Sequence, residues 1–407
     1  MTEPCRLCGN RELFPVIDLG DMPVAHRMLD DAQTPEDVFA FHVVHCPACG
    51  LSQIEYPIAP ETLYAGFNFN FSSWKNEPHL AQEADWVFAD RTFASAIDIG
   101  CNDGRFLAAV QDRGVETCVG IEPNHVPASK AAERGFPIVQ QMLDSSVAEE
   151  VITTYDKFDL VTSRQVLEHT LDPIAFLKAA RKLLKDDGLL FLDMPDFEPT
   201  LHHADVSTLW EEHPSYFTEP TLRRLLGEAG FECTGVRRYD FSGGCLAVTA
   251  IPASEPSPGN TDVPAVNDLA STFGARARAY GDDLMRYLQA RRDSGATVVL
   301  YGVGVRGCTA VNGYGLGPAI DFAVDDQKER QGLFLPGARL EIKPVEELAA
   351  ANDTVVVLLA VNNENEDKVT DRLRNLLGDR VTTISMCCPR DFGQDLRNLA
   401  AMDAVDR

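Results

Sequence analysis

The chain has 407 residues, of which 45% are hydrophobic and 24% charged, a composition typical of a globular protein with two or three domains. Its 36 basic and 62 acidic residues give a formal net charge of −26, which disfavours nucleic-acid binding, because that binding depends on Lys and Arg contacts with phosphates. We expect a cytoplasmic protein without a membrane span, since the sequence contains neither a run of about 18 apolar residues nor a signal-peptide pattern at its start.

Four of the eleven cysteines form two CxxC pairs: Cys5 and Cys8, Cys46 and Cys49. A CxxC turn directs two thiolates to one point, and two such turns complete the tetrahedron that zinc prefers. Four sulfur ligands leave no open position, so the pattern predicts a small lobe held together by a structural metal. Replacement of one cysteine by His42 or His45 is one alternative. A set of reduced cysteines or a redox pair is another.

Residues 96–106 have the pattern of an apolar strand, a glycine loop and the start of a helix. Gly100 and Gly104 would let the backbone approach a ligand closely. The next strand ends in Glu122, and a carboxylate at that place suits the two hydroxyls of a ribose. Asp98 would repel the pyrophosphate of a dinucleotide but suits a cationic amino group or a sulfonium. The segment therefore favours S-adenosylmethionine over NAD, and a turn that binds no ligand is the remaining alternative.

Further strands are predicted at 158–163 and 189–193, with a helix between them. This alternation predicts a parallel, doubly wound sheet. Gln165 follows the first of these strands, at the edge where ligands bind in such sheets, and is a candidate cofactor contact. Glu168 and His169 come next. We interpret them as the start of the following helix, with direct catalysis as the alternative.

The segments DIGCNDGRF, IEPN and SRQVLEHTLDP resemble the motifs of class I methyltransferases. With CxxC pairs before them and another α/β segment behind, the chain resembles the three-domain sugar C-methyltransferases of deoxysugar biosynthesis, which methylate C-3 of dTDP-4-keto-deoxyhexoses. The resemblance covers nearly the whole chain. It implies an α/β fold in which a class I methyltransferase Rossmann-like domain is preceded by a small zinc-binding lobe and followed by a second Rossmann-like domain. It also implies these cofactor-binding residues: Asp98, Gly100, Asn102, Gly104, Glu122, Pro123, Gln165 and Ser72.

The expected domain boundaries follow from the same pattern. We place a zinc-binding domain at 1–60, a methyltransferase domain at 61–250, a linker rich in Pro, Ser and Gly at 251–270, and a C-terminal substrate domain at 271–407. The aromatic, serine-rich segment around Ser72 resembles one that closes over cofactor and substrate in the family. Packing of its aromatic side chains on the core is the alternative.

The candidate catalytic segment is LWEEHPSYFT, residues 209–218. The family carries a segment resembling Y-H-E-H-x-S-Y-F here, which Glu212 and His213 match. Trp210 and Glu211 depart from it, because the family has Tyr and His at those places. The departure removes a hydroxyl that could stabilise an enolate oxygen, and it leaves the exact substrate open.

Carbon methylation needs a carbanion-like nucleophile, which forms when a proton next to a ketone is removed. His213 is the candidate general base, and Glu212 or Glu211 is the candidate group that orients it. The alternative is that His213 caps or packs at the start of the helix predicted after residue 218.

Residues 297–308 repeat the pattern of strand, glycine loop and helix, and GVGVRG resembles a dinucleotide fingerprint, which is weak evidence alone. Strands predicted at 321–326 and 354–360 complete a second Rossmann-like domain. A nearby loop matches a stretch of the family and is interpreted as structural, with a nucleotide contact as the alternative. Its matching residues are Lys328, Gly332, Pro336 and Gly337.

The sequence thus predicts a zinc-containing, S-adenosylmethionine-dependent C-methyltransferase that deprotonates carbon next to a ketone of a small molecule, an NDP-4-keto-deoxysugar. Three alternatives remain: the same fold used for O- or N-methylation or for epimerisation, a zinc-ribbon adaptor with an inactive methyltransferase domain, and an NAD oxidoreductase. We expect no nucleic-acid or membrane partner. The oligomeric state stays open, with a monomer as one possibility.

Overall fold

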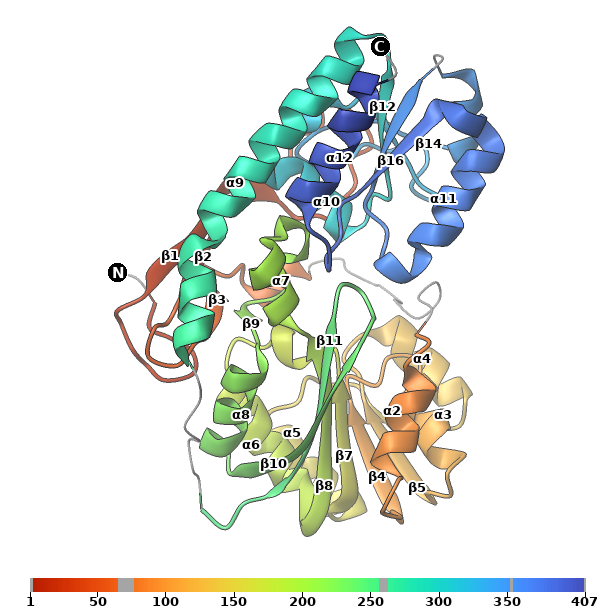
Figure 1. Ribbon diagram of the computed structural model, residues 1–407. Coiled ribbons are helices and arrows are strands. Elements are labelled where there is room, and N and C mark those ends of the chain that lie inside the picture. Colours follow the sequence, from red (N-terminus) through yellow and green to blue (C-terminus); the bar gives the residue numbers. More distant parts are fainter. Residues whose placement is uncertain (1–2, 65–76, 256–262, 352–353, 406–407) are drawn as a thin grey trace.

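The computed structural model describes residues 3–64, 77–255, 263–351 and 354–405. Three sheets organise these residues, with strand orders β1-β2-β3-β9, β10-β11-β8-β7-β4-β5-β6 and β14-β13-β12-β15-β16. In Figure 1 the large sheet occupies the lower half of the molecule and the smaller parallel sheet lies above it.

The first sheet is antiparallel and belongs to the N-terminal lobe. Its strands are β1 (Phe14–Pro23), β2 (Val38–His45), β3 (Ser52–Ile54) and β9 (Ser215–Tyr216), and the short helix α1 (Pro60–Leu63) follows β3. β9 comes from the candidate catalytic segment and pairs with β3, Ser52 opposite Tyr216 and Gln53 opposite Ser215. The lobe and the candidate catalytic segment therefore share one sheet.

The second sheet is the doubly wound sheet that the sequence predicts. Its strands are β4 (Ser95–Ile99), β5 (Thr117–Ile121), β6 (Ile138–Val139), β7 (Phe158–Arg164), β8 (Leu184–Pro195), β10 (Phe231–Tyr239) and β11 (Cys245–Pro252). The pairs from β8 to β6 are parallel, and β11 and β10 complete the sheet antiparallel. The chain leaves β4 toward β5 and returns on the other side with β7. Ligands bind at the carboxyl ends of strands beside such a reversal.

Helices cover this sheet. They are α2 (Leu80–Val87), α3 (Arg105–Gln111), α4 (His125–Glu133), α5 (Ser145–Tyr155), α6 (Pro173–Leu183) and α8 (Glu219–Glu228), with the 3₁₀ turn η2 (Leu167–His169). Helix α7 (Phe197–His203) and the 3₁₀ turn η3 (Val206–Thr208) pack instead against the N-terminal lobe. The central strands are almost continuously apolar and buried, as in Ile97, Val119 and Val161, because both faces of the sheet are covered.

The third sheet is entirely parallel and lies in the C-terminal domain. Its strands are β12 (Thr297–Tyr301), β13 (Phe322–Val324), β14 (Ile342–Lys343), β15 (Val355–Leu359) and β16 (Val381–Ser385). Its helices are α10 (Val305–Gly313), α11 (Asn363–Leu377) and α12 (Phe392–Val405), with 3₁₀ turns η4 (Gly317–Ala319), η5 (Val345–Ala350) and η6 (Gly378–Arg380). The prediction of a second Rossmann-like domain is confirmed.

The segment predicted as a linker, 251–270, is partly structured. Strand β11 extends to Pro252 at its start, and the long helix α9 (Val263–Asp293) begins within it. Proline is tolerated in the first turn, so Pro264 does not prevent the helix. Val266, Ala270 and Phe273 recur at helical spacing and are buried against the N-terminal lobe. Figure 1 shows that α9 runs from that lobe to the C-terminal domain, so this one helix connects the two.

Candidate active site and zinc centre

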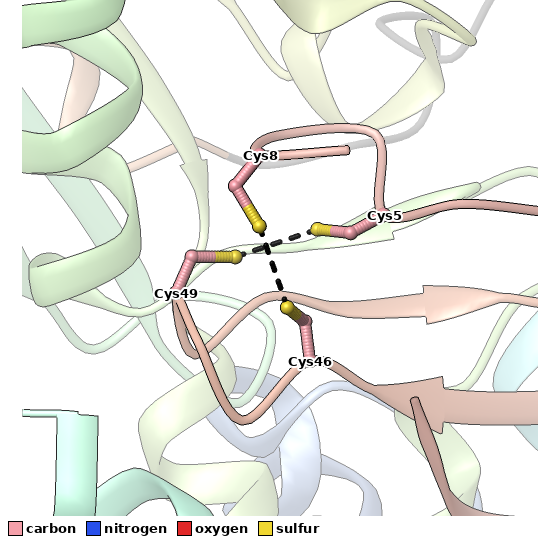
Figure 2. Close-up of side chains that lie close together, drawn as sticks. All are labelled: Cys5, Cys8, Cys46 and Cys49. Carbon is pink, nitrogen blue, oxygen red and sulfur yellow. Dashed lines mark hydrogen bonds between the residues drawn. The ribbon is translucent and has the colours of Figure 1, made fainter. Parts of the chain in front are cut away.

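The four predicted metal ligands come together in the N-terminal lobe. The Sγ atoms of Cys5 and Cys49 lie 3.4 Å apart and those of Cys8 and Cys46 lie 3.5 Å apart, and the two pairs cross in Figure 2. Sulfurs bound to zinc at 2.3 Å in a tetrahedron lie about 3.8 Å from one another, so the four thiols fit the ion.

The histidines proposed as alternative ligands have other partners. His45 is buried, and its ring nitrogens lie 2.9 Å from Ser52 Oγ and 2.7 Å from Asn267 Oδ1. His42 lies 3.2 Å from Asp18 and 3.4 Å from Glu55. The cluster is therefore a Cys₄ site.

Two buried carboxylates stand at the carboxyl ends of β4 and β5. Asp98 is 3% exposed and accepts a hydrogen bond from Thr162 Oγ1 over 2.7 Å. Burial raises its pKa to about 7. Glu122 accepts the backbone N–H groups of Asn102 (3.0 Å) and Asn124 (2.8 Å), and burial raises its pKa too. One carboxylate suits a cofactor ammonium and the other suits ribose hydroxyls, so this donor set fits S-adenosylmethionine.

The glycine loop between these carboxylates has the conformation that its sequence predicts. Gly100 has φ +73° and Gly104 has φ +78°, both in the left-handed region. A Cβ on Gly100 would lie 2.3 Å from Val166 Cγ2, so the loop packs directly on the chain that follows β7. Asn102, at φ +49°, lies between the glycines, and Pro123 is exposed after Glu122. Ser72, the remaining predicted contact, lies outside the described residues.

Gln165 stands at the carboxyl end of β7 with φ +54°. Its backbone N–H and its Nε2 donate to the carbonyl and to Oδ1 of Asp193, over 2.7 and 2.9 Å. Because the amide nitrogen is held in this way, the Gln165 carbonyl oxygen is the side-chain atom left for a ligand.

Asp193 belongs to a buried network that the sequence interpretation missed. Arg164 lies 3.3 Å from Asp193 and 2.8 Å from Glu83, and His79 lies 3.7 Å from Asp193. Cys245 donates its thiol to Asp193 over 2.5 Å. Despite burial, the positive charges and hydrogen bonds hold the pKa of Asp193 below its usual range. The sequence did hold a signal for this network. Asp193 ends the apolar strand predicted at 189–193, and Arg164 follows the strand predicted at 158–163.

A pocket opens beside these strand ends. It is lined by Gln165, Glu168, Pro195, Asp196, Phe197, Thr200, Thr208, Trp210, His213, Ser215, Tyr216, Phe217, Phe241, Ser242, Gly243, Gly244 and Arg306. It thus contains a predicted cofactor contact and the predicted base in one cavity.

His213 is buried in this pocket, with its ring centroid 4.8 Å from that of Trp210 and 4.7 Å from that of His169. Ligand atoms of Glu168, His169 and His213 lie within 4.8 Å of one another. His213 does not cap the next helix, because the capping box of α8 is formed by Thr218 and Thr221.

The structure assigns other partners to the carboxylates expected to orient His213. Glu212 Oε1 lies 3.1 Å from Nδ1 of His26, and Glu211 Oε1 accepts the backbone N–H of Ala25 over 2.7 Å. Burial, together with the neighbouring Glu212 carboxylate, raises the pKa of Glu211 to about 7. Both acids therefore face the N-terminal lobe, and Glu168 is the carboxylate beside His213.

Glu168 and His169 do not start the helix that follows. They form the separate turn η2, and α6 begins at Pro173, where Asp172 caps it by accepting the N–H of Ala175 over 2.9 Å. The break leaves Glu168 on the pocket wall.

The C-terminal loop that matches the family has structural contacts. Gly337 N–H donates to Glu36 over 3.0 Å, and Asn312 Nδ2 donates to the Pro336 carbonyl over 3.1 Å. Gly332 N–H donates to the Ile342 carbonyl over 2.8 Å, and the Lys328 carbonyl accepts from Gln331 N–H over 3.3 Å. These contacts agree with the structural interpretation of the loop.

The comparisons with known proteins agree with this arrangement. Three family models match in succession: "Putative zinc binding domain" at residues 5–64, "Methyltransferase domain" at 74–236 and "C-methyltransferase C-terminal domain" at 247–384. The chain is similar to C-methyltransferase NovU of Streptomyces niveus, with 28% identity over 88% of this chain and 90% of that protein.

Other relatives match a smaller share of the chain. The ubiquinone biosynthesis O-methyltransferase of Cereibacter sphaeroides (strain ATCC 17029 / ATH 2.4.9) is 34% identical over 33% of this chain, and the alignment spans 59% of that protein. A solved 1,6-didemethyltoxoflavin-N1-methyltransferase of Burkholderia thailandensis aligns with 52% of this chain and 96% of its own, at 17% identity and a TM-score of 0.37, a similarity too slight to inform function. No helix of the described residues is long and apolar enough to cross a membrane.

Proposed function

We propose that this zinc-containing, S-adenosylmethionine-dependent C-methyltransferase acts on a nucleotide-linked 4-keto-deoxysugar, which it methylates at a carbon next to the ketone. The observation that carries the proposal is the placement of His213. A buried histidine shares one pocket with Gln165, which stands at the cofactor edge of the sheet. A base beside a methyl donor is what carbon alkylation next to a carbonyl requires.

When bound, S-adenosylmethionine supplies an electrophilic methyl group on its sulfonium sulfur. Asp98 and Glu122 are proposed to hold the cofactor through its ammonium group and its ribose. His213 removes a proton from the acceptor carbon, and the neighbouring Glu168 carboxylate stabilises the imidazolium that results. Phe197, Trp210 and Tyr216 exclude water from the pocket, where free water would compete for the proton.

A single assay tests the proposal. The enzyme is incubated with S-adenosylmethionine and dTDP-4-keto-6-deoxy-D-glucose in D₂O, and the products are weighed by mass spectrometry. We expect a product heavier by one methyl group in the wild-type enzyme. The loss in His213→Ala is expected to be 10²- to 10⁴-fold, with cofactor affinity retained.

His202→Ala is the matched control, because His202 lies on α7 with a side chain 54% exposed and does not line the pocket. Deuterium uptake without methylation would indicate an enolising site and favour epimerisation. If the wild-type enzyme binds the cofactor but shows neither deuterium uptake nor methylation, this acceptor class is excluded.

A further inference from the structure

Arg306 is a buried cation that reaches the pocket from the C-terminal domain. It is the second residue of α10, is 4% exposed and lines the pocket that holds His213. Among the described residues that line this pocket, Arg306 is the one Lys or Arg side chain. Since a guanidinium stays charged at any working pH, the positive charge on this wall is permanent.

The pocket wall also carries two carboxylates, Glu168, which lies beside His213, and Asp196. Asp196 is engaged by Arg238 over 2.8 Å. Asp205, behind the wall, lies 3.8 Å from Arg306 and accepts the backbone N–H groups of Ser207 and Cys388, each over 2.8 Å. The nearest carboxylate is therefore shared with two backbone donors and is not in hydrogen-bond contact with the guanidinium.

The guanidinium has hydrogen-bond donors to spare. Nη1 donates to Ser207 Oγ over 2.9 Å and Nη2 donates to the Ser242 carbonyl over 2.7 Å. Nε is buried and has no hydrogen-bond partner among the described residues. A buried donor without a partner is unfavourable, and a ligand atom that accepts a hydrogen bond from it relieves that cost.

The Trp210 ring lies near both Arg306 and His213. The Arg306 Cζ atom lies 5.8 Å from the centre of the Trp210 ring, and the His213 ring lies 4.8 Å from it. The hairpin tip that receives Arg306 is itself held by the C-terminal domain, because Gly243 N–H donates to Asn363 over 3.2 Å. Figure 1 shows the β10–β11 hairpin rising toward that domain.

We propose that Arg306 is a catalytic residue that stabilises the negative oxygen formed when the acceptor enolises. This rests on the proposed function. His213 takes the proton, the C–H electron pair becomes the carbon–carbon π bond, and the carbonyl π pair moves to the oxygen. Arg306 donates to that oxygen. The C-terminal domain thereby supplies a charge to a reaction whose base lies in the methyltransferase domain.

The experiment measures hydrogen–deuterium exchange of the acceptor and methyl transfer to it separately in Arg306 variants. With dTDP-4-keto-6-deoxy-D-glucose as probe, deuterium incorporation is followed by NMR in D₂O without cofactor, and methyl transfer is followed with it. Removal of one oxyanion donor costs about 10²- to 10³-fold in kcat, so Arg306→Gln is expected to lose both reactions by that factor. Arg306→Lys retains more of each, because it keeps the charge.

Three further measurements separate a catalytic role from a structural one. S-Adenosylmethionine affinity and the urea midpoint report whether each variant is folded. Added guanidinium ion at low millimolar concentration is expected to restore exchange several-fold in Arg306→Ala. Arg390→Gln is the matched control in the same domain, because Arg390 pairs with Glu366 over 2.6 Å and does not line the pocket.

Exchange in folded Arg306→Gln within threefold of the wild-type rate would overturn the assignment and leave the proposed function standing. A raised KM with unchanged kcat would also overturn it, since that pattern marks a binding role alone. A wild-type enzyme that binds cofactor but neither exchanges nor methylates the probe would overturn the proposed function, and this inference with it.

Discussion

Gln165 is held by Asp193 through its backbone and through its side chain, with the two hydrogen bonds 2.7 and 2.9 Å long. The same carboxylate lies beside Arg164 and His79 and accepts the thiol of Cys245. One buried acid therefore couples the orientation of a pocket side chain to a charge network behind the sheet.

Substitution of Asp193 by Asn tests this coupling. The amide oxygen cannot replace two carboxylate oxygens, and Arg164 loses one of its counter-charges. We expect the free energy of unfolding to fall by about 3 kcal/mol, as on breaking a buried ion pair, together with a loss of kcat. Urea unfolding measures the first and the methyl-transfer assay the second. Asp186→Asn, on a side chain 88% exposed, should stay within about 0.5 kcal/mol of wild type.

Substitution of Cys46 by Ser tests the metal centre. A hydroxyl is a poor zinc ligand, so the variant is expected to retain little of the one zinc ion per chain that elemental analysis should find in the wild type. Methyl transfer should fall as well, because β3 of the lobe pairs with β9 of the catalytic segment. Cys233→Ser, at a half-buried position in β10, should keep its zinc. Full zinc content in Cys46→Ser would refute the site.

We expect Asp98 to make cofactor binding depend on pH. Its pKa is about 7 in the folded chain and about 3.9 unfolded, so the folded state binds more protons between these values. Its contribution to stability is therefore present below about pH 4 and is lost as pH rises to about 7. Cofactor binding has the opposite dependence, because an ammonium group needs the ionised carboxylate.

Affinity for S-adenosylmethionine should thus weaken by up to about tenfold per pH unit below 7, with proton release on binding near pH 7. Calorimetry in buffers of different ionisation enthalpy measures both. In Asp98→Asn the affinity should be lower and the proton release should vanish. Unchanged release would assign the proton to another group.

Gly100 and Gly114 form a matched pair for the glycine loop. Both have positive φ, +73° and +94°, so alanine strains either backbone by about 1–2 kcal/mol. A Cβ on Gly100 also meets Val166 at 2.3 Å, whereas one on Gly114 meets no atom of the described residues within 4 Å. Gly100→Ala should therefore be the less stable variant by an additional 1–3 kcal/mol or so, and should bind cofactor more weakly. Equal urea midpoints for Gly100→Ala and Gly114→Ala would show that the glycine loop can move enough to accommodate the added methyl group.

Short-range patterns determined what the sequence alone could predict. The two CxxC pairs, the glycine loop and the acid at Glu122 depend on spacing within one turn or one strand–loop–helix unit, and the backbone dictates their geometry locally. The same holds for the two α/β domains, since alternating apolar strands and amphipathic helices have few ways to pack.

Other features required the tertiary structure. The spacing around His213 suggested the adjacent Glu212 as its partner, yet Glu212 contacts His26, and Glu168 comes to the base from another strand end. Arg306 enters the pocket from a different domain. Consecutive residues on an extended turn point in different directions, so adjacency along the chain does not imply contact. Which distant charges meet in a buried pocket is decided by how the domains pack, because each buried charge must find its partner there.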